Sequence, residues 1–202
     1  MKNVRILFLL IMVCVSTMVK AQSADVAIGA SGWQGLRFSY NSYTLDVDDG
    51  NFDAVSAYEI GYAKGMQILK DSPLFLETGA SLFVVRGDLQ KWCSIKMNSL
   101  VVPLNMGYKV CSSEKISFFP YLGVALKGHI SGELDVDGYG DIDMFDNSEF
   151  GDKCNRMQLG WQIGMTMNVN DFNVGFSYGT DFLELDDDTE TKTLKITVGF
   201  NF

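Results

Sequence analysis

The chain has 202 residues, of which 47% are hydrophobic and 12% aromatic, and its formal net charge is −9. A chain this acidic offers no basic patch to neutralise phosphates, so nucleic acid is excluded as a partner. After the N-terminal segment, no apolar run approaches the roughly 18 residues that indicate a transmembrane helix. The apolar residues are therefore expected to alternate with polar residues along the chain.

The first residues have the layout of a secretory signal peptide. Basic Lys2 and Arg5 precede an apolar run at 6–15, and small and polar residues lead to Ala21. The run is too short to span a bilayer, although an uncleaved anchor is the alternative. The sequence predicts cleavage after Ala21, which leaves residues 22–202 as a single domain.

Alternation of apolar and polar residues recurs along the rest of the chain and predicts β-strands. It is complete in Met157–Val169 and strong in the last residues, TLKITVGFNF. Gly29–Gly35, GASGWQG, is expected to interrupt the first strand. The predicted strands are 36–45, 57–69, 74–86, 98–110, 116–130, 156–169, 172–182 and 193–202. Each is long enough for a tilted membrane crossing of roughly 9 to 11 residues.

The expected connections differ in length at the two ends of these strands. Those at 70–73, 111–115 and 170–171 are short. Longer acidic loops are expected at 46–56, 87–95, 131–155 and 184–191. This layout is typical of outer-membrane barrels, with both termini in the periplasm. The sequence thus predicts an all-β fold, an eight-stranded antiparallel up-and-down transmembrane β-barrel.

The main alternative is a soluble periplasmic barrel of the lipocalin kind that binds a hydrophobic ligand. The strands of such a barrel also alternate apolar and polar residues. It would need the apolar face to point inward. Here one face is almost wholly aliphatic and aromatic, and the other carries Gly, Ser, Thr, Asn and Gln with isolated charges. These faces suit hydrocarbon outside and a narrow polar lumen inside.

Three stretches carry a family resemblance: NSLVVPLNMGYKV at 98–110, FPYLG at 119–123 and the terminal TVGFNF. In these the chain resembles the outer-membrane β-barrel family of porin-like or PorT-like proteins, of the OmpA and OmpX type. The resemblance implies a location in the outer membrane of a Gram-negative bacterium, contact with its lipid, and no defined activity. Phe200 and Phe202 match the assembly signal that such barrels present to the barrel-assembly machinery. An extracellular or secretion-complex partner stays open.

Several charged residues fall on the predicted inward face. They are Arg37, Glu59, Glu77, Lys127, His129, Asp181 and Lys195. Buried charges must be paired or hydrated, so the sequence predicts a structural charge network that holds a plugged lumen together. A gated polar pathway is the alternative, but the interior of an eight-stranded barrel is generally filled by side chains.

A lipid-modifying outer-membrane enzyme is a third hypothesis. It would need a nucleophile with a base, and the single histidine, His129, is followed by Ser131 and Glu133 on the same expected face. Neighbours on one strand rarely form the directed hydrogen bond that activates a serine, and no orienting third group is identifiable. No catalytic activity is therefore expected.

The acidic loops raise the question of a cation site. Asp135, Asp137, Asp141 and Asp143 lie close together in the sequence, and clustered carboxylates on a flexible turn suit Ca²⁺. Their spacing does not match an EF-hand, which favours a solvated loop. No cysteine and histidine spacing suggests zinc, and no cofactor is expected. Cys93 and Cys154, both in long loops, are predicted to form a disulfide.

Overall fold

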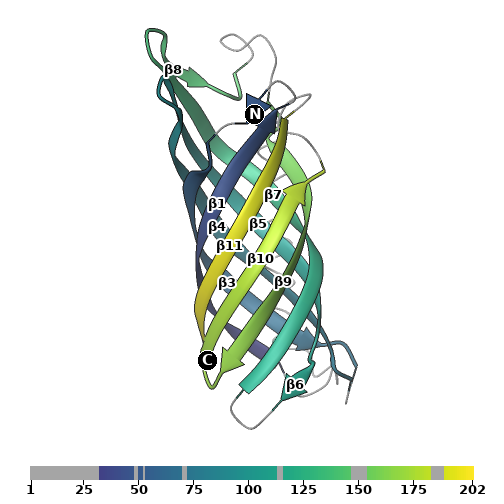
Figure 1. The fold of residues 1–202 in the computed structure, drawn as a ribbon. Coiled ribbons are helices and arrows are strands. Elements are labelled where there is room, and N and C mark those ends of the chain that lie inside the picture. The colour runs from purple at the N-terminus through teal and green to yellow at the C-terminus, as the bar shows by residue number, and fades with distance from the viewer. Residues whose placement is uncertain are drawn as a thin grey trace.

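The computed structural model describes residues 32–47, 50–51, 53–69, 72–112, 116–146, 154–182 and 189–202. Eight long strands form one closed antiparallel barrel, which confirms the predicted fold class (Figure 1). They are β1 Gly32–Val47, β3 Val55–Gln67, β4 Leu74–Gln90, β5 Cys93–Tyr108, β7 Ile116–Val136, β9 Met157–Val169, β10 Phe172–Asp181 and β11 Thr189–Asn201. The predicted signal peptide at 1–21 lies outside the described residues. In the described part of the chain, no helix is long and apolar enough to span a membrane.

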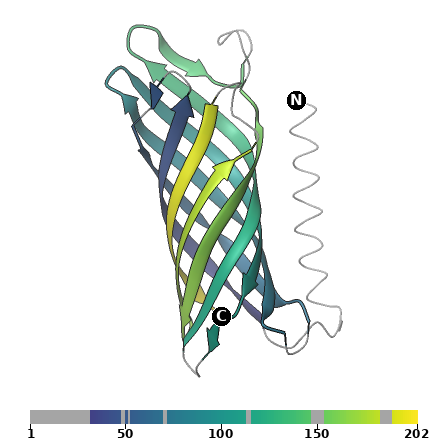
Figure 2. The ribbon, with the colours of Figure 1, turned by 45° about the vertical axis from the view of Figure 1, so that its right-hand side comes forward.

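Three short strands extend the sheet: β2 Gly50–Asn51 pairs with β1, and β6 Cys111–Ser112 and β8 Gly140–Asp143 pair with β7. β6 lies at the end of the barrel that holds the C-terminus, and β8 lies at the opposite end (Figures 1 and 2). We call the former the turn end and the latter the loop end. At the turn end, Asn170 has a φ of 52°, a conformation that Asn tolerates and that closes the tight β9–β10 turn.

The barrel closes where the last strand meets the first. β11 pairs with β1 along its length, from Asn201 opposite Gly35 to Thr189 opposite Val47. Both edges that an open sheet would present are thereby hydrogen-bonded. The chain needs its final residues in a strand because, without β11, β1 and β10 would each expose a row of unpaired backbone groups.

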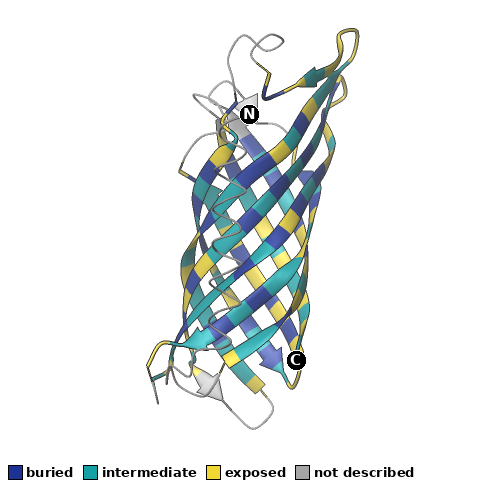
Figure 3. Ribbon diagram, turned by 180° about the vertical axis from the view of Figure 1, so that it is seen from behind, coloured by how far each residue is buried: buried dark blue, intermediate teal, exposed yellow. Residues whose placement is uncertain are grey.

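Alternation along the strands separates the two faces of the wall, as the bands of buried and exposed residues show (Figure 3). On β1, Phe38 is 48% exposed on the outside, whereas the next residue, Ser39, is 3% exposed on the inside. The outward apolar side chains continue around the barrel; they include Leu36, Tyr40, Tyr58, Ile60, Leu82, Leu104, Met106, Leu122, Ile163, Met165, Val174, Phe176, Leu194, Ile196 and Val198. The apolar face points outward, so the lipocalin-like alternative is wrong.

The start of the first strand differs from the prediction. GASGWQG was expected to interrupt it, but β1 begins at Gly32 and includes Gly35. Trp33 points inward, and its indole ring occupies the place where a Cβ on Gly65 of β3 would be. The glycines thus allow close packing of the wall rather than breaking the strand.

The strands also run further toward the loop end than predicted. The expected loop at 87–95 is a hairpin in which only Lys91 and Trp92 turn. In the expected loop at 131–155, β7 continues to Val136 and β8 folds back along it. A β-bulge shifts the pairing of β7 with β5: His129 lies opposite Ser99, but Ser131 lies opposite Asn98, so Ile130 is an extra residue.

The bulge reverses which residues of β7 face the lumen. Before it, Lys127 and His129 point inward; after it, Leu134 packs against the buried apolar residues and Glu133 is exposed. A continuous alternation read from the sequence therefore assigns the end of β7 to the wrong faces.

A glycine substitution tests the close packing of the wall. A Cβ on Gly164 would lie 2.6 Å from Cζ and Oη of Tyr121, whereas one on Gly107 would lie 3.6 Å from its nearest neighbours. We expect Gly164→Ala to lower the free energy of unfolding by about 1 to 3 kcal/mol, because the Tyr121 ring must move. Urea unfolding in detergent micelles measures this change. Gly107→Ala is the matched control and should leave it nearly unaltered; equal losses in both variants would contradict the packing.

Candidate functional site

Side chains project into the lumen in distinct layers along the barrel axis. At the turn end, Trp33, Phe75 and Phe119 form an aromatic cluster with ring centroids 4.6 to 5.4 Å apart. Phe75 and Phe119 are each only 4% exposed, and Lys109 places its ammonium 5.9 Å from the Phe119 ring. The sequence does not predict this cluster, because Trp33 lies in the expected interruption of the first strand and Phe75 and Phe119 lie near the starts of weakly alternating strands.

Glu77 and Arg37 occupy the next layer but do not form an ion pair with each other. The Glu77 carboxylate accepts hydrogen bonds from Trp33 Nε1 at 3.3 Å and Asn105 Nδ2 at 3.1 Å. Arg37 donates to Asn201 Oδ1 at 2.7 Å and to the Leu36 carbonyl at 3.0 Å. Glu77 is thus stabilised by neutral donors, a role for Trp33 and Asn105 that the sequence alone did not reveal.

Glu59 and Lys195 form the first of two ion pairs in the middle of the lumen. Lys195 Nζ lies 3.3 Å from Glu59 Oε2, and their side chains are 17% and 12% exposed. Ser81 Oγ donates to the other carboxylate oxygen at 2.5 Å. The contact crosses β1, which lies between β3 and β11, so it joins side chains of non-adjacent strands.

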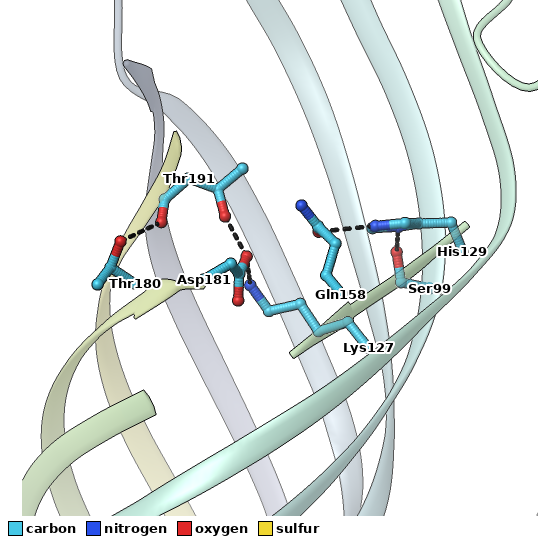
Figure 4. Close-up of polar contacts among 7 residues, drawn as sticks. All are labelled: Ser99, Lys127, His129, Gln158, Thr180, Asp181 and Thr191. Carbon is cyan, nitrogen blue, oxygen red and sulfur yellow. Dashed lines mark hydrogen bonds and ion pairs between the residues drawn. The ribbon is translucent and has the colours of Figure 1, made fainter. Parts of the chain in front are cut away.

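Lys127 and Asp181 form the second, more buried ion pair (Figure 4). The distance from Lys127 Nζ to Asp181 Oδ2 is 2.7 Å, and the side chains are 11% and 3% exposed. The same carboxylate oxygen accepts a hydrogen bond from the Thr191 hydroxyl, while Thr180 Oγ1 donates to the Thr191 carbonyl at 3.0 Å. Asp181 therefore ties β7, β10 and β11 together.

His129 lies on the loop-end side of this pair, in a buried hydrogen-bonded chain (Figure 4). Its Nδ1 lies 2.7 Å from Ser99 Oγ, and its Nε2 lies 2.7 Å from Gln158 Oε1. Because an amide oxygen only accepts, Nε2 carries the proton and Nδ1 accepts from the serine hydroxyl. The Phe145 ring stacks on the imidazole at 5.6 Å.

The serine that His129 contacts is not the one considered from the sequence. Ser131 lies past the bulge and accepts a hydrogen bond from Asn98 Nδ2 at 2.8 Å, so the expected grouping of His129, Ser131 and Glu133 is wrong. The observed Ser99–His129 pair has the atoms of a nucleophile and a base. However, both side chains are buried, because Ser99 is 0% exposed and His129 2%.

An apolar cluster lies at the loop end of the lumen, where the sequence predicted a polar interior. Its members are Tyr43, Leu45, Val55, Ala57, Phe83, Val85, Leu89, Cys93, Ile95, Met97, Val101, Ala125, Met144, Phe145 and Cys154. We call it the loop-end cluster. Seven of its fifteen members lie in stretches that the sequence predicts to be loops, where no inward face is expected: Val55, Leu89, Cys93, Ile95, Met144, Phe145 and Cys154.

The two cysteines belong to this cluster but are not joined by a disulfide, which corrects the prediction. Cys93 is 7% exposed and Cys154 4%, and each packs as a small apolar side chain. Burial raises the pKa of the Cys93 thiol, and the nearby Asp135 carboxylate raises it further. The thiolate needed for oxidation is therefore scarce at neutral pH.

The candidate calcium ligands take part in the β7–β8 hairpin. Lys96 Nζ lies 3.6 Å from Asp141 and 3.9 Å from Asp135, and Asp143 Oδ1 accepts from the backbone N–H of Phe145 at 2.8 Å. Asp137 is exposed near the tip and donates its backbone N–H to the Trp92 carbonyl at 2.9 Å. Among the described residues, no group of three or more ligands suited to a metal ion is found.

Two small cavities border the Glu59–Lys195 pair. One, of about 40 Å³, extends toward Lys127 and Asp181; the other, of about 60 Å³, extends toward Arg37 and Glu77. One buried water needs roughly 10 to 15 Å³ measured in this way, so each cavity has room for only a few water molecules.

The C-terminal phenylalanines lie on the outer surface. Phe200 is 46% exposed and packs against Phe172 of β10 with centroids 5.7 Å apart. Phe202 is 67% exposed, and its backbone N–H donates to the Gln34 carbonyl at 2.9 Å. The terminal residue is thus attached to β1 while its ring faces outward.

Comparisons with known proteins agree with this architecture. A family model described as the outer membrane protein beta-barrel domain matches residues 7–202. Among solved structures, the attachment invasion locus protein Ail of Yersinia pestis has a TM-score of 0.54 at 14% identity, over 85% of this chain and 99% of its own. Neisserial surface protein A gives 0.49 at 13%, over 84% and 97%.

The outer-membrane enzyme PagL gives a TM-score of 0.43 at 10% identity, over 80% of this chain and 98% of its own. A search of curated proteins gives no match. At these identities the likeness concerns the fold alone.

A charge-removing substitution tests the buried ion pair. Asp181→Asn leaves the Lys127 ammonium buried without a counter-charge, so we expect the free energy of unfolding to fall by about 3 to 5 kcal/mol. Urea unfolding in lipid vesicles gives the value, and Lys127→Met combined with Asp181→Asn should recover part of the loss. Lys96→Met is the control, because its side chain is 43% exposed and such pairs contribute at most about 1 kcal/mol. A loss for Asp181→Asn no larger than the control's would contradict this role.

Proposed function

Because the chain belongs to the outer-membrane β-barrel family, we propose that it is a closed, non-catalytic barrel whose loop end contacts a partner. Membership places the protein in the outer membrane. The proposal adds export by the signal peptide at 1–21, a lumen closed to solutes, and a structural or interaction role. The filling of the lumen is the observation that carries it.

Three layers oppose the passage of solutes. The aromatic cluster occupies the turn end, the two ion pairs cross the middle, and the loop-end cluster occupies the other end. The cavities between them hold only a few waters each. An ion entering this path would lose its hydration in two apolar layers, which is energetically prohibitive.

We further propose that the turn end lies in the periplasm and the loop end outside the cell. Short turns on the periplasmic side and longer extracellular connections are usual in such barrels. The placement leaves Phe200, on the outward face of β11, and the exposed Phe202 after its end at the periplasmic rim, where assembly machinery can reach them. It also puts the acidic hairpin residues outside, where their charge favours a basic partner.

The loop end offers a defined surface for that partner. The β4–β5 and β7–β8 hairpins are tied together by the hydrogen bond from Asp137 to the Trp92 carbonyl. Trp92 at one tip is 51% exposed, and Tyr139 at the other is 86% exposed. Exposed aromatic residues beside charged ones are typical of protein interfaces. We infer that these tips contact an extracellular protein or a secretion complex.

The burial of Ser99 and His129 supports a non-catalytic role over a lipid-modifying enzyme. The Ser99 hydroxyl and the His129 imidazole already hydrogen-bond each other, and the imidazole donates to Gln158 Oε1. A lipid substrate would have to displace Phe145 or cross the barrel wall to reach them. The ion pairs and apolar clusters of the lumen are therefore proposed to stabilise the fold.

Single-channel recording tests the closed lumen. We expect purified barrel in planar lipid bilayers to give no current steps above the bilayer baseline, because both apolar layers block hydrated ions. A porin reconstituted in parallel shows that the bilayers report channels. Reproducible, long-lived conductance steps from the barrel at low voltage would overturn the proposal.

Epitope insertion tests the orientation. We expect a tag inserted between Asp137 and Gly138 to bind antibody on intact cells, since this turn is at the loop end and Gly138 has open space around it. The matched insertion between Asn170 and Asp171 should bind only after permeabilisation. The reverse pattern, measured by flow cytometry with expression checked by blotting, would place the loop end in the periplasm.

A further inference from the structure

Lys64 is a charged residue on the outward face of the barrel wall. It lies on β3 between Ala63 and Gly65, which are buried, so alternation points its side chain outward. Its cross-strand neighbours on the same face are Gln34 of β1 and Thr78 of β4. In the part of the chain that the structure describes, the Lys64 ammonium forms no hydrogen bond or ion pair. An unpaired ionisable group that faces the membrane is costly, and it marks a functional site by default.

The polar patch formed by Gln34, Lys64 and Thr78 is enclosed by apolar side chains. Exposed Leu36 and Ile60 lie on its loop-end side, and exposed Ile68 and Leu69 lie on its turn-end side. Across the barrel, the outward residues of β10 and β11 nearest the turn end are apolar: Phe172, Val174, Val198 and Phe200. A ring of polar residues at the membrane boundary would include these strands as well. The patch is therefore a local feature of β1, β3 and β4.

Hydrogen bonds within the patch leave two neighbouring donors unused. The Tyr62 hydroxyl donates to Gln34 Oε1 at 2.9 Å, and Gln34 Nε2 has no partner among the described residues. The Thr78 hydroxyl gives its proton to the Pro103 carbonyl at 2.8 Å. Because Gln34 and Lys64 are directly opposite in an antiparallel pair, their Cβ atoms are about 5 Å apart. Gln34 Nε2 and Lys64 Nζ thus lie side by side, and the second carries a charge.

This pair of donors fits a ligand that is anionic and only accepts hydrogen bonds. No carboxylate lies opposite Lys64 on either neighbouring strand, so the described wall does not supply the counter-charge. A phosphodiester has one negative charge and acceptor oxygens only. The phospholipids around the turn end supply this group on all sides of the barrel, and no further protein is required.

We propose that Lys64 and Gln34 bind the phosphate of a phospholipid in the leaflet at the turn end, with a preference for headgroups of net negative charge. Lys64 Nζ offsets the phosphate charge, and Gln34 Nε2 donates to a second oxygen. The acyl chains lie against Leu36 and Ile60. A zwitterionic headgroup fits less well, because its own ammonium repels that of Lys64. The inference rests on the membrane location of the family and not on the closed lumen or the partner; in the proposed orientation this leaflet is the periplasmic one.

A lipid titration followed by NMR tests the site. The whole barrel, with ¹⁵N-labelled glutamine, is placed in phosphatidylcholine nanodiscs in which phosphatidylglycerol replaces an increasing fraction of the lipid. We expect a saturable shift of the Gln34 side-chain amide, assigned by its loss in Gln34→Leu. Lys64→Met should weaken the apparent affinity about fivefold, because one lysine near an anionic lipid surface contributes about 1 kcal/mol. Lys64→Arg should keep the affinity. A missing shift, or equal affinity in Lys64→Met, would overturn the proposal.

A carboxylate introduced beside Lys64 gives a second test that keeps the lysine. Gln34→Glu places a counter-charge opposite the ammonium, so we expect the preference for phosphatidylglycerol to be lost. Preferences are compared by native mass spectrometry of the folded barrel with both lipids. Ser42→Glu, on the outward face of β1 nearer the loop end, is the matched control and should keep the preference.

Three outcomes would point to another occupant and overturn the lipid site. A preference that persists in Gln34→Glu would show that the patch is not the site. An equal saturable shift with soluble glycerol phosphate would identify a site for free phosphate. A shift seen only in nanodiscs that hold two barrels would identify a second copy of the chain.

Discussion

Every backbone polar group of a membrane-embedded wall must find its partner within the wall, because lipid offers none. The pairing of β11 with β1 meets this condition, since it removes the two edges that an open eight-stranded sheet would present to hydrocarbon. The rest of the structure depends on this closure. It fixes the interior as a narrow space, and it forces the charges of non-adjacent strands into contact across that space.

The narrowness of the interior explains why the charged residues occur in matched sets. Glu59 and Asp181 each face one lysine, while Glu77 is held by the neutral donors of Trp33 and Asn105. Water cannot reach these carboxylates freely, so each needs a local donor to offset its desolvation. The polar layer therefore joins side chains of non-adjacent strands, and it lies between two apolar clusters.

The sequence predicted the strands and their outward face well because lipid imposes a simple alternation on β9, β10 and β11. It also placed the seven charged residues on the inner face, although their pairing depends on cross-barrel register, which no local pattern encodes. Ile130 shows most clearly what local alternation in the sequence cannot predict. One bulged residue reverses the faces of β7, so Ser131 lies outside, and the partner of His129 is Ser99, thirty residues earlier in the chain.

The same bulge determines what the loop end is. With the reversed phase, Leu134 and Val136 turn inward and pack on the loop-end cluster, while Glu133 and Asp135 face out beside Lys96. This apolar packing stabilises the β7–β8 hairpin against the loop end of the barrel. On the outer side, the ammonium of Lys96 offsets the repulsion between Asp135 and Asp141. An acidic stretch that reads as a solvated loop is thus an extension of the barrel wall. Its inward side chains pack on the loop-end cluster, and the extra residue at 130 determines which of its side chains face inward.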